Sequence, residues 1–495
     1  MDSPTHVALI SSPGMGHLFP SLELATRLST RHHLTLTVFL VTSHSSSAEN
    51  NVVAAAEAAG LFTVVELPPA DMSDVTDFTV VGRLAITMRR HVPALRSAIS
   101  ALTSRPSALI ADIFSTEAFA VADEFHMAKY VFVASNAWFL ALTIYAQVLD
   151  KQIVGQYVDQ KKPLQIPGCE PVRPCDVVDP MLDRTEFQYY EYVKVGMAIA
   201  SSHGVLVNSW DELQGRALAS FKDRSLLGRV MKAPVYSIGP IVRHFGSGKD
   251  GSSELFNWLR KQPGKSVIYV SFGSGGTLSF EQMTEMAHGL ELSRQRFVWV
   301  VRPPTVRSDA MFFTIGDGSD DQSKARFLPE GFLERTSEVG FLVSMWAEQT
   351  AVLGSPAVGG FFTHGGWNSS LEGITKGVPM IVWPLYAEQR MNATMLADEM
   401  GVAVRPKELP GNAVIGREEI AAMVRKIMAA EDEEGKAIRA KVEELQRSAE
   451  KACAQGGSSY QNFARVVKLF GRYVVIIIIQ RPGLNYRHTA KLAGS

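Results

Sequence analysis

The chain has 495 residues, 46% of them hydrophobic, and 49 Lys and Arg residues nearly balance 50 Asp and Glu residues, giving a net charge of −1 at pH 7. This length exceeds what one hydrophobic core usually organises, so we expect two domains. The balanced charge, without a basic tract beyond what a solvated helix face carries, argues against nucleic acid as a partner.

Cysteine usage and the first residues indicate where the protein works. Cys169, Cys175 and Cys453 are too few and too scattered for a disulfide framework or a metal site, which fits a reducing cytoplasm. The start, MDSPTHVALISS, lacks the charged beginning and the long apolar core of a signal peptide. The apolar run Val474 to Ile479 is too short to cross a bilayer. We therefore expect a cytoplasmic protein without a membrane span, and we take it to be a monomer.

The first predicted elements are a strand over His6 to Ser11, a tight loop over Pro13 to Gly16 and a helix over Pro20 to Leu28. His17 lies at the junction of loop and helix. The helix dipole should hold this histidine in its neutral form, which a general base requires. In isolation, His17 would be better explained as a half-exposed loop histidine.

The context of His17 favours the catalytic interpretation. A strand over Ala108 to Ala111 ends in Asp112, and the carboxyl ends of parallel strands converge on one crevice, so we expect Asp112 to meet His17. The carboxylate would then fix the tautomer of the imidazole. Beyond this strand, Phe114 and Trp138 are the first candidates for the wall of an apolar acceptor pocket, followed by Phe139 and Tyr145, although helical spacing also suits core positions.

The same N-terminal loop allows a second interpretation, a dinucleotide-binding fingerprint that begins with Gly14 and Gly16. The third glycine is missing, because Phe19 occupies its position. The second strand, Leu34 to Val41, is followed by Thr, Ser and His rather than by an acidic residue for a ribose. The sequence therefore disfavours a nicotinamide enzyme.

A polar run, HFGSGKDGSS at His244 to Ser253, separates two series of strands and helices. We expect two doubly wound α/β domains that face a cleft. Their residues are 1–242 and 255–470, with a linker at 243–254 and an atypical tail at 471–495. Strands are predicted over Val235 to Ile241, Ser266 to Phe272, Arg296 to Val301, Phe341 to Met345, Val358 to Thr363 and Met380 to Leu385.

The most informative stretch runs from Trp346 to Gln389. Within it, a buried strand leads through a turn at His364 into a helix that opens near Asn368. A helix N-terminus carries unpaired N–H groups and partial positive charge, so it suits a phosphate. The alternative is structural, since Ser369 and Glu372 have the spacing of a capping box.

This stretch resembles the signature box of the plant family-1 glycosyltransferases, which transfer a sugar from a UDP-sugar to a small molecule. The pattern W…Q, HxGWNSxxE, P…EQ falls at Trp346, Gln349, His364, Gly366, Trp367, Asn368, Ser369, Glu372, Pro384, Glu388 and Gln389. The resemblance implies the two-domain GT-B architecture. It also implies that His17 of the PGMGH segment is the base that deprotonates the acceptor and that Asp112 orients it.

The resemblance further assigns the donor contacts. Uracil would stack on Trp346 with Ala347 and Gln349 beside it, and Glu372 would accept from the ribose hydroxyls. The diphosphate would lie on His364, Asn368 and Ser369. The hydroxyls of the donor's sugar would contact Trp367, Glu388 and Gln389, and the glutamine at the end of the box favours glucose as that sugar. Apart from the resemblance, the glycine-rich loop SFGSGGTLS follows a predicted strand and offers Ser274 as a phosphate neighbour, and an ordinary turn between elements explains that loop equally well.

Three positions depart from the usual pattern of that family. Glu348 stands where proline is usual, Gly365 where cysteine is common, and Glu388 where aspartate is commoner. Losing the proline frees a backbone angle just before Gln349, so we expect weaker uracil binding.

The implied reaction is inverting transfer of glucose from UDP-glucose to a small phenol of the hydroquinone or phenylpropanoid type. No D-x-D triplet occurs in the chain, so we expect no metal and no cofactor. The alternatives are another UDP-sugar, a flavonoid or terpenoid acceptor, or a UDP-sugar binder without catalysis. The polar segment Pro303 to Arg326 and the tail after Leu469 fall outside the resemblance, and we expect activity without residues 472–495.

Overall fold

The computed structural model describes residues 5–42, 47–75, 79–243, 254–305, 327–410 and 413–480, without the side chains of 47–48 and 472–480. Nearly all of the expected linker, most of the polar segment after Pro303 and the end of the tail lie outside the described residues.

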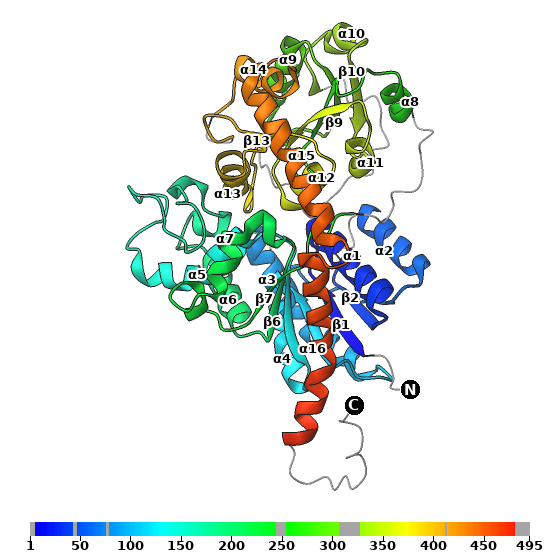
Figure 1. The fold of residues 1–495 in the computed structure, drawn as a ribbon, viewed down its shortest axis with the longest axis vertical. Helices are drawn as coiled ribbons and strands as arrows, with labels where there is room; N and C mark the ends of the chain where they lie inside the picture. Colours follow the sequence, from blue (N-terminus) through cyan, green and yellow to red (C-terminus); the bar gives the residue numbers. More distant parts are fainter. Residues whose placement is uncertain are drawn as a thin grey trace.

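Two parallel sheets organise the described chain (Figure 1). The N-terminal sheet has seven described strands in the order β3-β2-β1-β4-β5-β6-β7, and the C-terminal sheet has six in the order β10-β9-β8-β11-β12-β13. Helices cover both faces of each sheet, which confirms two doubly wound domains. The strands of the first sheet are β1 His6–Ser11, β2 Thr35–Leu40, β3 Thr63–Glu66, β4 Ala108–Asp112, β5 Ala128–Val133, β6 Gly204–Val207 and β7 Val235–Ser237. Those of the second are β8 Val267–Ser271, β9 Arg296–Val301, β10 Gly340–Ser344, β11 Val358–Thr363, β12 Met380–Val382 and β13 Ala403–Val404.

Helices connect the strands and pack over them. Those of the N-terminal half are α1 Met15–His32, α2 Ser47–Ala59, α3 Val80–Ser100, α4 Phe119–Glu124, α5 Ala137–Gln152, α6 Phe187–Ala200 and α7 Asp211–Lys222. Those that follow are α8 Glu254–Arg260, α9 Phe280–Ser293, α10 Phe332–Thr336, α11 Gln349–Leu353, α12 Trp367–Thr375, α13 Gln389–Thr394, α14 Arg417–Met428, α15 Glu433–Cys453 and α16 Ser458–Gln480. No helix within the described ranges is both long enough and apolar enough to cross a bilayer.

The predicted elements agree with the structure in type, and several differ at their ends. The strands predicted over His6 to Ser11, Arg296 to Val301 and Val358 to Thr363 have those bounds. The first helix, however, begins at Met15 and keeps Pro20 inside it. His17 therefore belongs to the first turn of α1 rather than to a loop.

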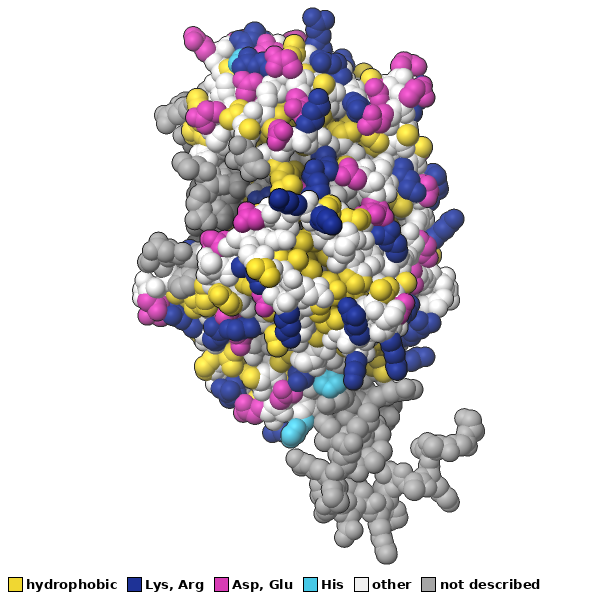
Figure 2. All heavy atoms as spheres, turned by 90° about the vertical axis from the view of Figure 1, so that its left-hand side faces the viewer, with side chains coloured by type: hydrophobic (Ala, Val, Ile, Leu, Met, Phe, Trp, Pro, Cys, Tyr) yellow, Lys and Arg dark blue, Asp and Glu magenta, His cyan; other side chains and the backbone are white. Residues whose placement is uncertain are grey.

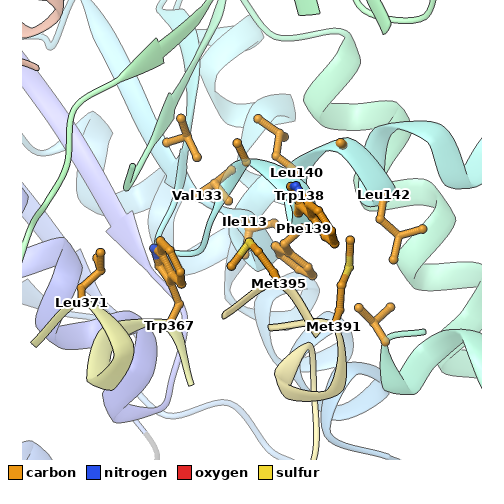
Figure 3. Close-up of a cluster of buried hydrophobic side chains, with 14 of the residues drawn as sticks. Ile113, Val133, Trp138, Phe139, Leu140, Leu142, Trp367, Leu371, Met391 and Met395 are labelled. Carbon is orange, nitrogen blue, oxygen red and sulfur yellow. The ribbon is translucent and has the colours of Figure 1, made fainter. Parts of the chain in front are cut away.

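A shared core joins the two domains. Trp138 of α5 lies in the same buried cluster as Trp367 of α12 and Met391 of α13 (Figure 3). Trp138 is 1% exposed. Burying these side chains against each other stabilises one relative placement of the domains, because separation would expose apolar surface to water.

The last helix returns to the N-terminal domain. Phe463, Val466 and Phe470 of α16 are buried in the cluster formed by the N-terminal sheet, and Figure 1 shows α16 running alongside that sheet. The residues expected to close the C-terminal unit at 470 thus pack on the other one. Backbone helix continues to Gln480, which includes the apolar run Val474 to Ile479.

The return of α16 predicts a stability effect. Phe470 is fully buried, and its ring meets Tyr130 edge-on with centroids 4.9 Å apart. Phe470→Ala should lower the free energy of unfolding by about 3–5 kcal/mol, as expected for a buried aromatic residue. Urea denaturation followed by circular dichroism measures it. Lys468→Ala on the exposed side of the helix is the control, and equal losses in the two variants would contradict this packing.

Candidate active site

A cleft between the domains holds the candidate site. Its cavity has a volume of about 970 Å³ and is lined by the carboxyl ends of strands from both sheets. On the face shown in Figure 2, Lys and Arg side chains are interspersed with Asp and Glu, and apolar side chains gather near the level where the domains meet. A cavity of this size suits a nucleotide sugar together with a small acceptor.

His17 and Asp112 meet in this cleft, as the sequence predicts. Nδ1 of His17 lies 3.0 Å from Oδ1 of Asp112, which is 1% exposed. The Ser12 hydroxyl donates to the other carboxylate oxygen. Because an ionised carboxylate only accepts, the imidazole proton lies on Nδ1 and leaves Nε2 as the basic nitrogen. Gly14, with φ of 102°, makes the turn that brings this end of α1 to the strand.

The charge state of His17 differs from the expectation based on the helix dipole. Burial lowers the pKa of His17, but the Asp112 charge, its hydrogen bond and the Glu388 charge together raise the pKa above the ordinary value of 6.5. The predicted direction of the pKa shift is therefore wrong, because the carboxylates of Asp112 and Glu388 outweigh the effect of burial. A raised pKa makes the nitrogen a stronger base once it is neutral.

Helix α12 presents its N-terminus to the same cleft. Gly366 is the N-cap and no side chain caps the helix. Ser369 and Glu372 instead accept hydrogen bonds from the side-chain amide of Gln349, at 2.8 and 2.7 Å. The capping-box alternative is thus wrong, and these residues form a prearranged polar group beside free backbone N–H donors.

His364 stays neutral beside this helix end. Burial, with a smaller contribution from the Arg302 charge, lowers the pKa of His364 to about 4. A neutral imidazole can donate a hydrogen bond to an anion without exchanging protons with solvent near neutral pH.

Arg302 is a residue that the sequence analysis missed. It directly follows β9 and is 6% exposed, and no carboxylate of the described residues lies within ion-pair distance. Its guanidinium donates to the carbonyl of Ser274 and, at 3.0 Å, to that of Met345. Burial lowers its pKa to about 10, which leaves it charged at neutral pH. The sequence signal that would have identified Arg302 is a cationic residue directly after an apolar strand, as in FVWVVR.

Asn368 joins the two halves of the site. Its side-chain nitrogen donates to the carbonyl of Gly16, one residue before His17, at 2.9 Å. That carbonyl is available because the residue four positions later is Pro20, which has no N–H to complete the helical bond. A proline inside α1 therefore creates the acceptor that the other domain uses.

Trp367 differs from its predicted role. Its side chain is 2% exposed, and its indole N–H donates to the carbonyl of Asn208 at 2.7 Å. The side chain is therefore occupied by the domain interface and cannot donate to a sugar hydroxyl. Trp367 still lines the cavity at the start of α12, where the first backbone N–H groups of a helix have no intrahelical partner.

Glu388 and Gln389 lie at the start of α13, where the domains approach. The Ser135 hydroxyl donates to Glu388 at 2.9 Å. The Gln389 side-chain oxygen accepts from the backbone N–H groups of Leu385 and Tyr386, at 2.9 and 3.0 Å. That arrangement uses the side-chain oxygen of Gln389 within the protein, so its amide nitrogen is the group left to donate, and Gln389 is among the residues that line the cavity.

The predicted donor residues come together in one cavity. Trp346 lies 5.0 Å from the guanidinium of Arg243, which also stacks on Phe19 at 3.7 Å. This cation–π pair across the cleft was not predicted. The lining includes Ser274, Trp346, Ala347, Gln349, His364, Trp367, Asn368, Ser369, Glu372, Glu388 and Gln389.

The two acceptor candidates separate. Phe114 lines the cavity, and its ring meets His17 edge-on with centroids 5.2 Å apart. Trp138 does not line it, so that prediction is wrong: the helical spacing placed Trp138 on the face of α5 that packs into the shared core. Phe139, one position on, lines the cavity instead.

Comparisons with known proteins agree with this geometry. Residues 243–414 match the family model "UDP-glucoronosyl and UDP-glucosyl transferase". Anthocyanidin 3-O-glucosyltransferase 5 of Manihot esculenta is 53% identical over 464 residues, covering 93% of this chain and 94% of that protein. The chain belongs to the plant UDP-glycosyltransferases. This glycosyltransferase is also 40% identical over 470 residues to hydroquinone glucosyltransferase of Rauvolfia serpentina, covering 94% of this chain and 98% of that one.

Solved structures extend the likeness to the fold. TcCGT1 in complex with UDP is 45% identical to the glycosyltransferase and superposes with a TM-score of 0.89 over 95% of this chain and 100% of that one. A UDP-glucosyltransferase from Polygonum tinctorium is 36% identical with a TM-score of 0.85, over 95% of this chain and 100% of that one. The expected GT-B architecture is confirmed.

The raised pKa of the glycosyltransferase's His17 predicts a titration. Because the carboxylates favour the imidazolium, NMR of histidine-labelled protein should show His17 titrating above 6.5, and Asp112→Asn should lower this pKa. Asp123→Asn, which removes an exposed carboxylate elsewhere on the domain, is the control. An unchanged His17 titration in Asp112→Asn would contradict the pairing.

Proposed function

We propose that this glycosyltransferase transfers glucose from UDP-glucose to a hydroxyl of a small phenolic acceptor, with inversion at the anomeric carbon. The observation that carries the proposal is that the basic nitrogen of His17 opens onto the same cavity as the prearranged group of Gln349, Ser369 and Glu372. A base and a nucleotide site that share one cleft supply the two requirements of a direct displacement.

In the proposed reaction, Nε2 of His17 takes the proton of the acceptor hydroxyl as its oxygen bonds to the anomeric carbon. Asp112 holds the ring and stabilises the imidazolium that forms. The bond to the UDP oxygen breaks on the opposite face of the sugar, so the configuration inverts without a covalent intermediate. Negative charge that develops on the diphosphate meets the N-terminus of α12 and the neutral His364.

The acceptor proposal rests on the cavity wall and on relatives. Phe114 and Phe139 offer apolar ring surface beside His17, which suits a flat aromatic alcohol. One relative is named for hydroquinone. A flavonoid acceptor is the second candidate, because the 53% identical relative is named for anthocyanidin. The proposal that the donor sugar is glucose rests on the family resemblance at Gln389.

Metal independence and the cytoplasmic, monomeric state stay proposals. The helix N-terminus, His364 and the buried charge of Arg302 are the groups that would meet the diphosphate in place of a cation. Three free cysteines fit a reducing compartment.

A turnover assay tests the function. The purified chain should convert UDP-glucose, in preference to UDP-galactose and UDP-xylose, with hydroquinone, coniferyl alcohol or an anthocyanidin, followed by mass spectrometry. His17→Ala should lower turnover about 10²–10⁴-fold through loss of the base. His33→Asn at the far end of α1, where the backbone is left-handed, is the control because asparagine tolerates that conformation. UDP binding without product from any pair would favour the non-catalytic binder.

Metal removal is a separate test. Turnover after exhaustive treatment with EDTA should equal that of untreated enzyme, and added Mg²⁺ or Mn²⁺ should not raise it, because the proposed charge stabilisation is supplied by protein groups. Loss of activity that Mg²⁺ or Mn²⁺ restores would contradict metal independence.

A further inference from the structure

The loop between β12 and α13 carries an unusual backbone conformation. Ala387, immediately before Glu388 and Gln389, has φ of 57°. The left-handed region is disfavoured for a residue with a Cβ by about tenfold in population, equivalent to about 1.4 kcal/mol. A conformation of this kind persists where the surrounding structure determines it.

The determining contacts come from the other domain. The N–H of Ala387 donates to the carboxylate of Asp179 at 2.6 Å, and the N–H of Asp179 donates to the carbonyl of Ala387 at 3.2 Å. Asp179 thereby uses both backbone polar groups of this one residue. Its second carboxylate oxygen pairs with Arg390 at 2.5 Å, so the carboxylate also meets the first turn of α13.

Asp179 is well placed to act from the acceptor side of the cleft. It opens a short 3-10 turn, Asp179–Met181, in the segment between α5 and α6. Three residues earlier, the buried Asp176 accepts from Thr394 at 2.8 Å, further along the same helical segment. The two aspartates hold successive turns of the chain that follows the loop.

Local contacts also hold the loop around Ala387, including the bond that the Gln389 N–H donates to the Tyr386 carbonyl at 3.2 Å. Gln389 already holds the backbone of Leu385 and Tyr386 through its side-chain oxygen. Glu388 is held by Ser135. Because Ala387 lies between these two groups, its φ sets the direction in which Glu388 and Gln389 leave the loop.

We propose that Asp179 is a positioning residue for the donor sugar. It holds Ala387 in the left-handed conformation and thereby aims Glu388 and Gln389 at the sugar, an inference that rests on the proposed function of this cleft. The uridine contacts expected at Trp346 and Glu372 lie on other segments, Trp346 after β10 and Glu372 within α12. Removing Asp179 should therefore affect recognition of the sugar and leave recognition of UDP intact.

The test distinguishes recognition of the sugar from recognition of the nucleotide. In Asp179→Ala, kcat/KM for UDP-glucose should fall about tenfold, and the ratio of the Kd of UDP-glucose to that of UDP, measured by calorimetry, should rise, while the Kd of UDP stays constant. Asp398→Ala, which removes an exposed carboxylate paired with Arg405 nearby, should change neither quantity.

A second substitution distinguishes positioning from general stability. Ala387→Gly in the Asp179→Ala background should restore part of the loss, because glycine adopts the left-handed conformation without a Cβ penalty. An unchanged Kd ratio in Asp179→Ala, equal weakening of UDP and UDP-glucose, or no rescue by glycine would each overturn the proposal. Absence of turnover in the unsubstituted enzyme would instead count against the proposed function, since the Kd ratio needs no chemistry.

Discussion

The hydrogen bond from Asn368 to the Gly16 carbonyl is the contact on which the site depends. It ties the first turn of α12, which lines the cavity, to the first turn of α1, which carries His17. The acceptor exists because Pro20 cannot complete the helical bond to that carbonyl. One proline thus leaves α1 with a free carbonyl oxygen at the point where the other domain arrives, and His17 and the N-terminus of α12 are held together.

Around this contact, apolar burial stabilises one placement of the domains. Trp138, Trp367 and Met391 pack in one cluster, and the indole N–H of Trp367 donates across the interface to Asn208. Residues that a motif would assign to ligand binding therefore divide into two groups. Some face the cavity, and others, such as Trp367, use their side chains to hold the cavity's walls in place.

The electrostatics of the cleft differ between its two sides. Beside His17, the charges of Asp112 and Glu388 raise its pKa and favour proton uptake. Beside the N-terminus of α12, burial and Arg302 keep His364 neutral, and Arg302 itself has no carboxylate partner among the described residues. A developing negative charge on a leaving group is stabilised on the side where positive potential is uncompensated.

Local patterns predict the α/β class, most strand positions and the pairing of His17 with Asp112, and they mark the stretch from Trp346 to Gln389 whose residues line one cavity. Apolar runs, glycine loops and motif spacing are short-range properties, and parallel strands bring their carboxyl ends together without further information. Only the tertiary structure decides that Trp138 is a core residue and that the indole N–H of Trp367 donates to Asn208. It likewise decides that Arg302 is buried without a carboxylate partner among the described residues and that α16 returns to the N-terminal domain. The tertiary structure also decides the direction in which the pKa of His17 shifts. These outcomes depend on which groups from distant parts of the chain come together and exclude water from one another. Burial and Coulomb energy are set by these three-dimensional neighbours and not by the order of residues in the chain.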